Sequence, residues 1–134
     1  MDAAPSSSNS LDRWSRRDWW GIVIDTNDVA TLTNFYSELR GWPIYHHDEM
    51  GSSFDAGEGV AYIAIQYNEN YVRPSWPATE SNQQMMLHLD FQVADLGAEV
   101  QRAIELGAVS AEFQPQPTVH VMFDPSGHPF CLYT

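Results

Sequence analysis

The stretch from residue 86 to 93 holds the side chains best suited to chemistry in this chain. His88 and Asp90 stand two positions apart, a spacing that puts both side chains on one face of a β-strand. An imidazole beside a carboxylate is a candidate general acid or base. A carboxylate on an inward face must also be hydrogen-bonded or paired. We therefore expect His88 and Asp90 to form the polar part of a cavity and, if the protein is an enzyme, to be its catalytic residues.

The remaining reactive side chains, the cysteine and two adjacent histidines, are weaker candidates for catalysis or metal binding. Cys131 is the only cysteine, which excludes an internal disulfide and fits a reducing compartment such as the cytoplasm. As a nucleophile it would need a base, which His88 or His120 could supply only if the fold brings them together, so a buried inert thiol is the preferred interpretation. His46 and His47 are adjacent on a predicted strand, so their side chains point to opposite faces and cannot easily share one ion.

These residues sit inside an internal repeat. Residues 21–41 have the pattern of an alternating strand, a short segment that ends in Asp, a helical stretch and a glycine. Residues 88–108 repeat this series with an offset of 67. The offset superposes Asp28 on Asp95, which are candidate helix N-caps. Gly41 and Gly107 stand where each helix should end. The chain is thus expected to fold as two like modules with a shared cleft at the seam.

Each module is expected to add three strands after its helix. In the first module these lie near 44–48, 53–56 and 60–67, and in the second near 110–113, 119–123 and 130–133. The segment 124–128, with the sequence Asp-Pro-Ser-Gly-His, has the residues of a tight turn. We divide the chain into a disordered tail over 1–18 and one domain over 19–134, made of module one (19–67), a linker (68–84) and module two (85–134).

Charge narrows the possible partners. The chain carries a net charge of -12, and residues 19–134 contain three arginines against fifteen acids. A nucleic acid would be repelled by that field. Anionic small molecules are disfavoured too, because they would need a clamp of cationic side chains. Arg40 and Arg102 lie on predicted helices and only Arg73 lies in a loop, so no such clamp is expected. No apolar run is long enough for a membrane span, and the polar N-terminal segment does not favour a secretory signal.

Two further motifs carry a family resemblance. The segments Phe35-Tyr36-Ser37-Glu38-Leu39-Arg40-Gly41 and Asp124-Pro125-Ser126-Gly127-His128-Pro129-Phe130, together with the duplicated strand-Asp-helix-Gly unit, resemble the vicinal oxygen chelate superfamily of glyoxalases, bleomycin-resistance proteins and extradiol dioxygenases. The resemblance covers about 19–134. It implies an α+β fold in which tandem βαβββ modules form an incompletely closed, eight-stranded mixed β-barrel around a ligand, and it implies a homodimer.

The same resemblance implies where a metal would bind. Metal-dependent members take four ligands from the first and last strands of the two modules, and the corresponding positions here are Gly21, Gln66, His88 and Cys131. Only His88 is a strong ligand for a divalent cation, and Gly21 has no side chain. One His, one Cys and one Gln do not make a usual open zinc or iron site. We therefore expect no metal and no other cofactor.

Strand alternation predicts what fills the cleft instead. Along each strand, the residues that alternate onto the same face as His88 should point into the cleft. The residues on the opposite face are almost all aliphatic or Phe, and they should pack under the helices. The predicted ligand-binding residues are Trp19, Val23, Tyr62, Gln66, Trp76, Met86, His88, Asp90, Gln92, His120, Met122, Cys131 and Tyr133. Trp76, in the linker, is a candidate for a lid or a subunit contact.

Three functions follow, in order of preference. The first is a metal-independent protein that sequesters an aromatic or polycyclic, neutral or cationic small molecule, as antibiotic-resistance members of the superfamily do. The second is a metal-independent lyase or isomerase that uses His88 or Asp90 as acid or base. The third is a glyoxalase-type metalloenzyme. Whether the protein is an enzyme at all stays open at this point, with binding preferred.

Overall fold

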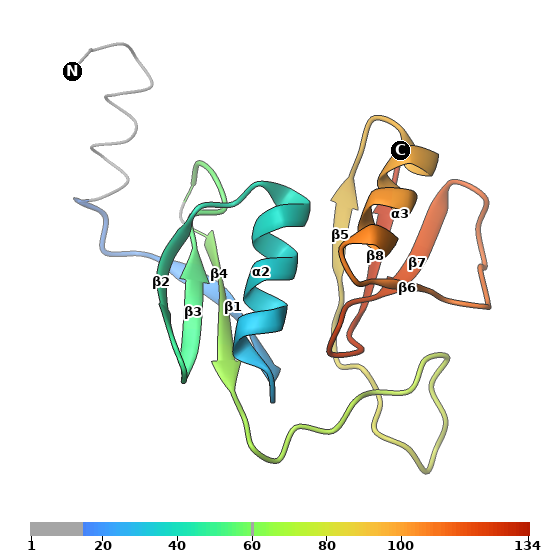
Figure 1. The fold of residues 1–134 in the computed structure, drawn as a ribbon, viewed down its shortest axis with the longest axis horizontal. Coiled ribbons are helices and arrows are strands. Elements are labelled where there is room, and N and C mark those ends of the chain that lie inside the picture. Colours follow the sequence, from blue (N-terminus) through green and yellow to red (C-terminus); the bar gives the residue numbers. More distant parts are fainter. Residues whose placement is uncertain (1–14, 60) are drawn as a thin grey trace.

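A computed structural model describes residues 15–59 and 61–134, which form two βαβββ modules (Figure 1). The first module consists of β1 (Trp20–Thr26), α2 (Val29–Arg40), β2 (Ile44–Asp48), β3 (Gly51–Phe54) and β4 (Ala61–Tyr67). The second consists of β5 (Leu89–Gln92), α3 (Leu96–Glu105), β6 (Val109–Ser110), β7 (Val119–Phe123) and β8 (Pro129–Tyr133).

Each module forms its own four-stranded sheet, in the orders β1-β4-β3-β2 and β5-β8-β7-β6. The first and last strands of each module pair in parallel, and the remaining pairs are antiparallel. The predicted fold class is therefore confirmed. In the part of the chain that the structure describes, no strand pairing joins the two sheets, so β1 and β5 are sheet edges and the barrel is open between them.

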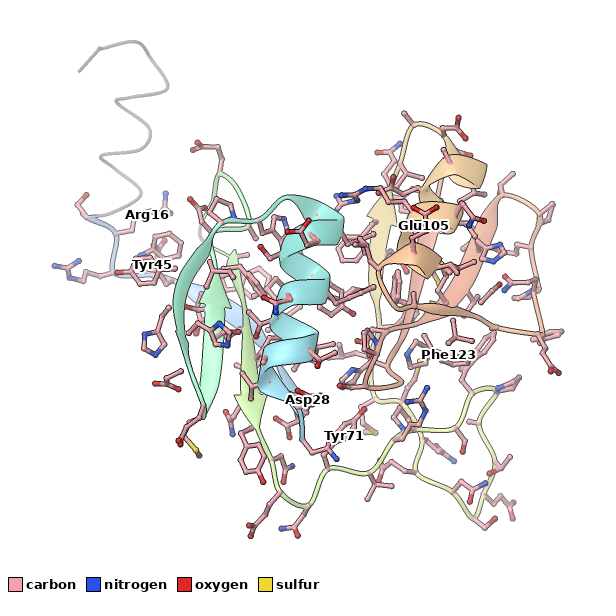
Figure 2. The ribbon with its side chains drawn as sticks, in the orientation of Figure 1. Arg16, Asp28, Tyr45, Tyr71, Glu105 and Phe123 are labelled. Atoms are coloured by element: carbon pink, nitrogen blue, oxygen red, sulfur yellow. The ribbon has the colours of Figure 1, made fainter. Side chains whose placement is uncertain are left out.

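Both helices begin where their flanking residues predict, and α2 also ends where they predict, whereas the C-cap of α3 is Leu106 in a right-handed conformation, one residue before Gly107. Asp28 and Asp95 are the N-caps, and their carboxylates accept hydrogen bonds from Thr31 N and Ala98 N. Asp28 marks the start of α2 in Figure 2. Helix α2 ends at Gly41, which has a φ of 70°, a left-handed conformation that glycine adopts without steric cost.

Helix α2 lies between the two sheets and is packed against both (Figure 1). Its Phe35 and Tyr36 rings contact Phe130 of β8 and Phe91 of β5, with ring centroids 5.8–6.4 Å apart. One hydrophobic core thus combines residues of both modules. The helix-covered faces of both sheets point into this core, so their opposite faces point away from it. We call these opposite faces the outward faces.

Strand β5 is shorter than expected, because the predicted strand 86–93 is regular only from Leu89. The pairing of β5 with β8 begins at Leu89 and Phe130. One residue earlier His88 would face Pro129, which has no backbone N–H to donate. Strand β6 is likewise limited to two residues. Residues 1–14 of the predicted tail lie outside the described residues, and no described helix is long and apolar enough to cross a membrane.

Candidate functional site

A cavity of about 400 Å³ lies at the seam where β1, the linker and the start of β5 meet. We call it the seam cavity. It is lined by Val23, Ile24, Asp25, Tyr36, Asn68, Asn70, Tyr71, Val72, Pro74, Gln83, Gln84, Met85, Met86, Leu87, His88, Leu89, His128 and Pro129. Apolar walls with a few polar groups are typical of small-molecule sites. Of the predicted site residues, Val23, Met86 and His88 line it.

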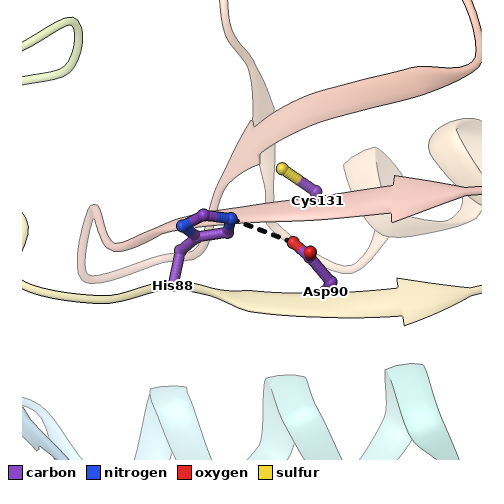
Figure 3. A group of neighbouring side chains, drawn as sticks. All are labelled: His88, Asp90 and Cys131. Atoms are coloured by element: carbon purple, nitrogen blue, oxygen red, sulfur yellow. Dashed lines mark ion pairs between the residues drawn. The ribbon is translucent and has the colours of Figure 1, made fainter.

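Beside the cavity, His88, Asp90 and Cys131 form a cluster on the outward face of module two (Figure 3). His88 Nε2 lies 3.0 Å from an Asp90 oxygen, and one ligand atom from each of the three residues lies within 4.8 Å of the others. Cys131 comes next to Asp90 because the two residues pair in register across β5 and β8. The alternation of these strands predicts that the three residues share one face, but it does not indicate Asp90 as a potential ligand.

The Cys131 thiol is held in its protonated form. Burial, with a further contribution from the Asp90 carboxylate and its hydrogen bond to the thiol, raises the pKa of Cys131 to about 11. A thiol that stays protonated is a poor nucleophile. This environment agrees with the expected inert thiol and gives no support to a Cys131 nucleophile.

The residues present do not fit the two-module metal site that the resemblance implies. His, Asp and Cys are all zinc ligands, but the three donors come from module two alone. The repeat places Gly21, Val23 and Ala64 at the equivalent positions of module one, because Val23 pairs with Ala64 as Asp90 pairs with Cys131. None of these three has a ligand atom. Gln66, the ligand position that the resemblance implied on β4, lies two residues further along the strand and pairs with Asp25. The Tyr62 ring also covers Gly21, where a Cβ would meet ring atoms at 2.5 Å.

A second carboxylate–histidine pair lies in the turn between β7 and β8. Asp124 is buried, with its side chain 0% exposed, and its oxygens lie 2.8–2.9 Å from His128 Nδ1. Tyr36 Oη donates to the same carboxylate at 2.7 Å, and the backbone N–H groups of Ser126 and His128 donate at 2.9 and 3.0 Å. Burial and the Asp124 carboxylate raise the pKa of Tyr36. Asp124 is thus fully hydrogen-bonded despite its burial.

This network joins the two modules through the linker. Tyr71 donates its hydroxyl proton to the Ser126 carbonyl at 2.7 Å, and its ring centroid lies 5.2 Å from that of His128. The hydroxyl groups of Thr26 and Ser126 are 2.7 Å apart. Tyr71 lies on the linker segment that passes below α2 (Figure 2). The seam cavity therefore has one wall fixed by buried hydrogen bonds.

The prediction that His120 and Met122 face the cleft is wrong. Met122 is 0% exposed and belongs to the shared core, and it pairs with Phe130, whose side chain lies on the helix-covered face. His120 shares that parity, and its Nε2 lies 2.6 Å from the Ser110 hydroxyl. The error is one of strand phase, because Val121, and not Met122, lies opposite Cys131. Shifting a strand by one residue exchanges its two faces.

Linker residue Trp76 covers part of the outward face of module two. Its ring lies 5.8 and 6.5 Å from the rings of Phe113 and Phe123, and it packs against a small cluster that includes Val121 and Cys131. The other predicted residues lie apart from the seam cavity. Trp19 precedes β1, Tyr62 and Gln66 lie on β4, and Gln92 and Tyr133 pair with each other.

The three arginines of the folded body are not among the described residues that line the seam cavity. Arg102 of α3 donates to the carbonyls of Glu38 and Leu39 at the end of α2, at 2.7 and 3.0 Å. The Arg40 guanidinium lies 4.4 Å from the centroid of the Phe91 ring. Arg73 lies against Gly127, which has a φ of 93°. Among the described residues that line the seam cavity, none is Lys or Arg.

His128, Asp124 and Tyr71 belong to the site but were not predicted from the sequence. The segment 124–128 gave a turn signal, and both Asp124 and His128 are compatible with a turn alone. Nothing in the sequence indicated that Tyr36 of module one and Tyr71 of the linker would meet this turn, at separations of 88 and 55 residues. The i to i+4 spacing of Asp124 and His128 was the only available hint.

Comparison with known families identifies the family of this chain. The profile of the glyoxalase-like domain matches residues 21–133. The chain belongs to this family. It is accordingly a member of the vicinal oxygen chelate superfamily, as its motifs predicted. A comparison with curated protein sequences finds no significant match.

Solved structures show that this glyoxalase-like protein shares its fold with both family enzymes and resistance proteins. A glyoxalase/bleomycin resistance protein/dioxygenase family enzyme from Burkholderia phytofirmans is similar with a TM-score of 0.64 and 19% identity, over 84% of this chain and 94% of that one. A fosfomycin resistance protein from Mesorhizobium loti gives 0.63 and 16%, over 89% and 92%. A fosfomycin resistance protein from Listeria monocytogenes, complexed with Mn(II) and sulfate, gives 0.65 and 14%, over 89% and 90%.

Proposed function

We propose that this glyoxalase-like protein binds an aromatic or polycyclic, neutral or cationic small molecule in the seam cavity without a metal, and so sequesters it. The observation that carries the proposal is the lining of this cavity. Aliphatic and Met side chains, amides, two tyrosines, two histidines and one carboxylate line it, and none of its described lining residues is Lys or Arg. The volume of about 400 Å³ is suitable for a ligand of a few fused rings.

The lining favours a flat, weakly polar or positively charged ligand. Met85, Met86 and Leu87 offer adaptable apolar contacts, and Gln83 and Gln84 offer amide donors and acceptors. Asp25 adds a negative charge and accepts a hydrogen bond from Asn68 Nδ2 at 3.0 Å. A chain with a net charge of -12 also concentrates cations near its surface.

The ligand we propose differs in charge from fosfomycin, the antibiotic named for two of the structural neighbours. Fosfomycin carries a phosphonate, and phosphonates are bound by cationic clamps of Arg or Lys. Arg102 donates to the end of α2, the Arg40 guanidinium lies over the Phe91 ring and Arg73 lies beside Gly127. None of these arginines is among the described residues that line the cavity. Resistance to a different, neutral or cationic antibiotic is consistent with this cavity. The free thiol of Cys131 supports a cytoplasmic setting for this function.

We further propose a homodimer, in which β1 of one chain lies beside β5 of the other and the outward faces of the two modules meet. Both strands are open edges in the single chain, and open edges are normally covered. Large apolar side chains lie exposed beside these edges, namely Trp20, Val23, Met86 and Leu87. A two-fold axis would repeat the same contact twice and close the barrel on both sides.

Three matched aromatic probes test the binding function. We expect proflavine, a planar cation, and neutral 4-nitroanisole to quench intrinsic Trp fluorescence and raise the melting temperature, because they suit a cavity with apolar walls and one carboxylate. The aromatic anion 8-anilinonaphthalene-1-sulfonate should bind at least about tenfold more weakly, since none of the described residues that line the cavity is Lys or Arg. Val23→Arg should reduce proflavine binding, with His46→Asn as the control outside the cavity. Equal affinity for all three probes would contradict the proposal.

A metal-independent enzyme is the second candidate, and the imidazole–carboxylate pairs beside the cavity favour it. Turnover of a small organic substrate by acid–base chemistry should then be lost in His88→Asn or Asp90→Asn with the fold intact. Elemental analysis of protein purified without chelators tests the metalloenzyme. A stoichiometric metal that is lost in His88→Asn would show that the cluster of His88, Asp90 and Cys131 holds an ion, and would contradict the metal-free proposal.

A further inference from the structure

We propose that His128 is the acid–base residue of the seam cavity, and that its Nε2 atom recognises a hydroxyl group on the aromatic ligand. The inference rests on the proposed function, because it names the group by which the cavity would select among aromatic molecules. His128 lines the seam cavity, and its ring is fixed by the buried Asp124 and by Tyr71.

The hydrogen bonds of the ring decide which nitrogen is available. His128 Nδ1 lies 2.8 and 2.9 Å from the two Asp124 oxygens, so Nδ1 carries the proton that the carboxylate accepts. Nε2 has no hydrogen-bond partner among the described residues, and in the neutral ring it is an acceptor. A histidine whose far nitrogen is held by a buried carboxylate is the arrangement that orients imidazole bases in hydrolases.

Burial distinguishes this pair from the pair formed by His88 and Asp90. The His88 and Asp90 side chains are 37% and 55% exposed, against 21% and 0% for His128 and Asp124. Water screens an exposed pair and lets both side chains rotate. A buried and fully hydrogen-bonded carboxylate holds its partner in one orientation. His128 is therefore the better-positioned base of the two, although His88 lines the same cavity.

The proton transfer needs only the ligand hydroxyl group and the His128 ring. The O–H bond of a phenolic or enolic ligand breaks, an N–H bond forms at His128 Nε2, and the electron pair stays on the ligand oxygen. The resulting imidazolium lies beside the Asp124 carboxylate. The side-chain amide of Asn70, which also lines the cavity, can donate to the ligand oxygen, whereas Gln84 Nε2 already donates to the Thr79 carbonyl at 2.9 Å. No oxidant, reductant or further reactant is needed.

The probe pair 4-nitrophenol and 4-nitroanisole tests the inference, because the two differ by the O–H group. We expect the protein to bind 4-nitrophenol about tenfold more tightly, as one hydrogen bond to a fixed imidazole allows. We also expect the absorbance band of the nitrophenolate to increase on binding, which reports proton transfer directly. Equilibrium dialysis measures the affinities and absorbance spectroscopy measures the proton.

His128→Asn separates contact with the probe from support of the fold. The Asn amide nitrogen can replace Nδ1 as the donor to Asp124, while the ring nitrogen Nε2 is removed. We expect this variant to keep its melting temperature within a few degrees and to bind both probes equally. His46→Asn, on exposed β2, should keep the wild-type preference. A preference for 4-nitrophenol that survives in His128→Asn would overturn the inference.

A measurement on the unaltered protein covers the case in which the variant does not fold. Diethyl pyrocarbonate acylates unprotonated imidazole nitrogens, and peptide mass spectrometry locates the modified histidines. We expect 4-nitrophenol to protect His128 and leave the reaction of His46 unchanged. Absence of protection at a saturating probe concentration would overturn the inference. If 4-nitroanisole and proflavine bind but 4-nitrophenol has no advantage, only this inference fails, whereas binding of no probe at all overturns the proposed function with it.

Discussion

At the scale of single residues, the outward face of module two shows how a reactive side chain is kept unreactive. Cys131 lies next to Asp90 because β5 and β8 run in parallel register, and the carboxylate accepts a hydrogen bond from the thiol, which keeps its proton. Deprotonation would put two negative charges side by side on a partly buried surface. The thiol therefore serves as a small packing group behind His88 and Asp90.

This arrangement predicts slow alkylation of Cys131. Because burial and Asp90 raise its pKa to about 11, the thiolate fraction is small at neutral pH and grows as the pH rises toward that value. Asp90→Asn removes the charge and should lower the pKa, so iodoacetamide should react faster at the same pH. Asp48→Asn, on the distant strand β2, should change nothing. Labelling of the wild type at neutral pH as fast as that of glutathione would contradict the assignment.

At the scale of elements, the first strand of module one has no side chain at the position equivalent to His88, and a ring from the neighbouring strand β4 fills the space. Gly21 and Tyr62 pair in register on β1 and β4, and the Tyr62 ring occupies the space that a side chain at position 21 would need. The equivalent position in module two carries His88. The two modules therefore share the βαβββ topology, but only module two has a potential ligand at this position.

Gly21→Ala tests this packing. The new Cβ would meet the Tyr62 ring at 2.5 Å, so we expect about 1–3 kcal/mol of destabilisation, as for other overpacked sites. Chemical denaturation measures the free energy of unfolding, and the double variant with Tyr62→Ala should recover most of the loss. Gly97→Ala on α3 is the matched control. Its nearest described neighbour atom lies at 3.9 Å, so it should leave stability unchanged or raise it by up to about 1 kcal/mol.

At the scale of the whole molecule, the shared core around α2 directs the outward faces away from each other. A closed barrel then requires a second chain, and sedimentation should give twice the 15.2 kDa of one chain. Trp20→Asp, at the exposed start of edge strand β1, should shift the protein toward monomer. Tyr45→Asp on β2, at the far edge of the same sheet, should leave the dimer intact. A monomeric wild type at high concentration would contradict the proposed assembly.

The sequence by itself determined the parts that depend on local order. The offset of 67 residues predicted two like modules, Asp28 and Asp95 predicted both helix starts, and alternation put His88 and Asp90 on one face, because caps and strand periodicity act over a few neighbouring residues. The tertiary structure alone decided the phase of β7, the contact of Asp90 with Cys131, and the meeting of Tyr36, Tyr71, Asp124 and His128. These depend on register and packing between distant segments, which a single strand or turn does not encode.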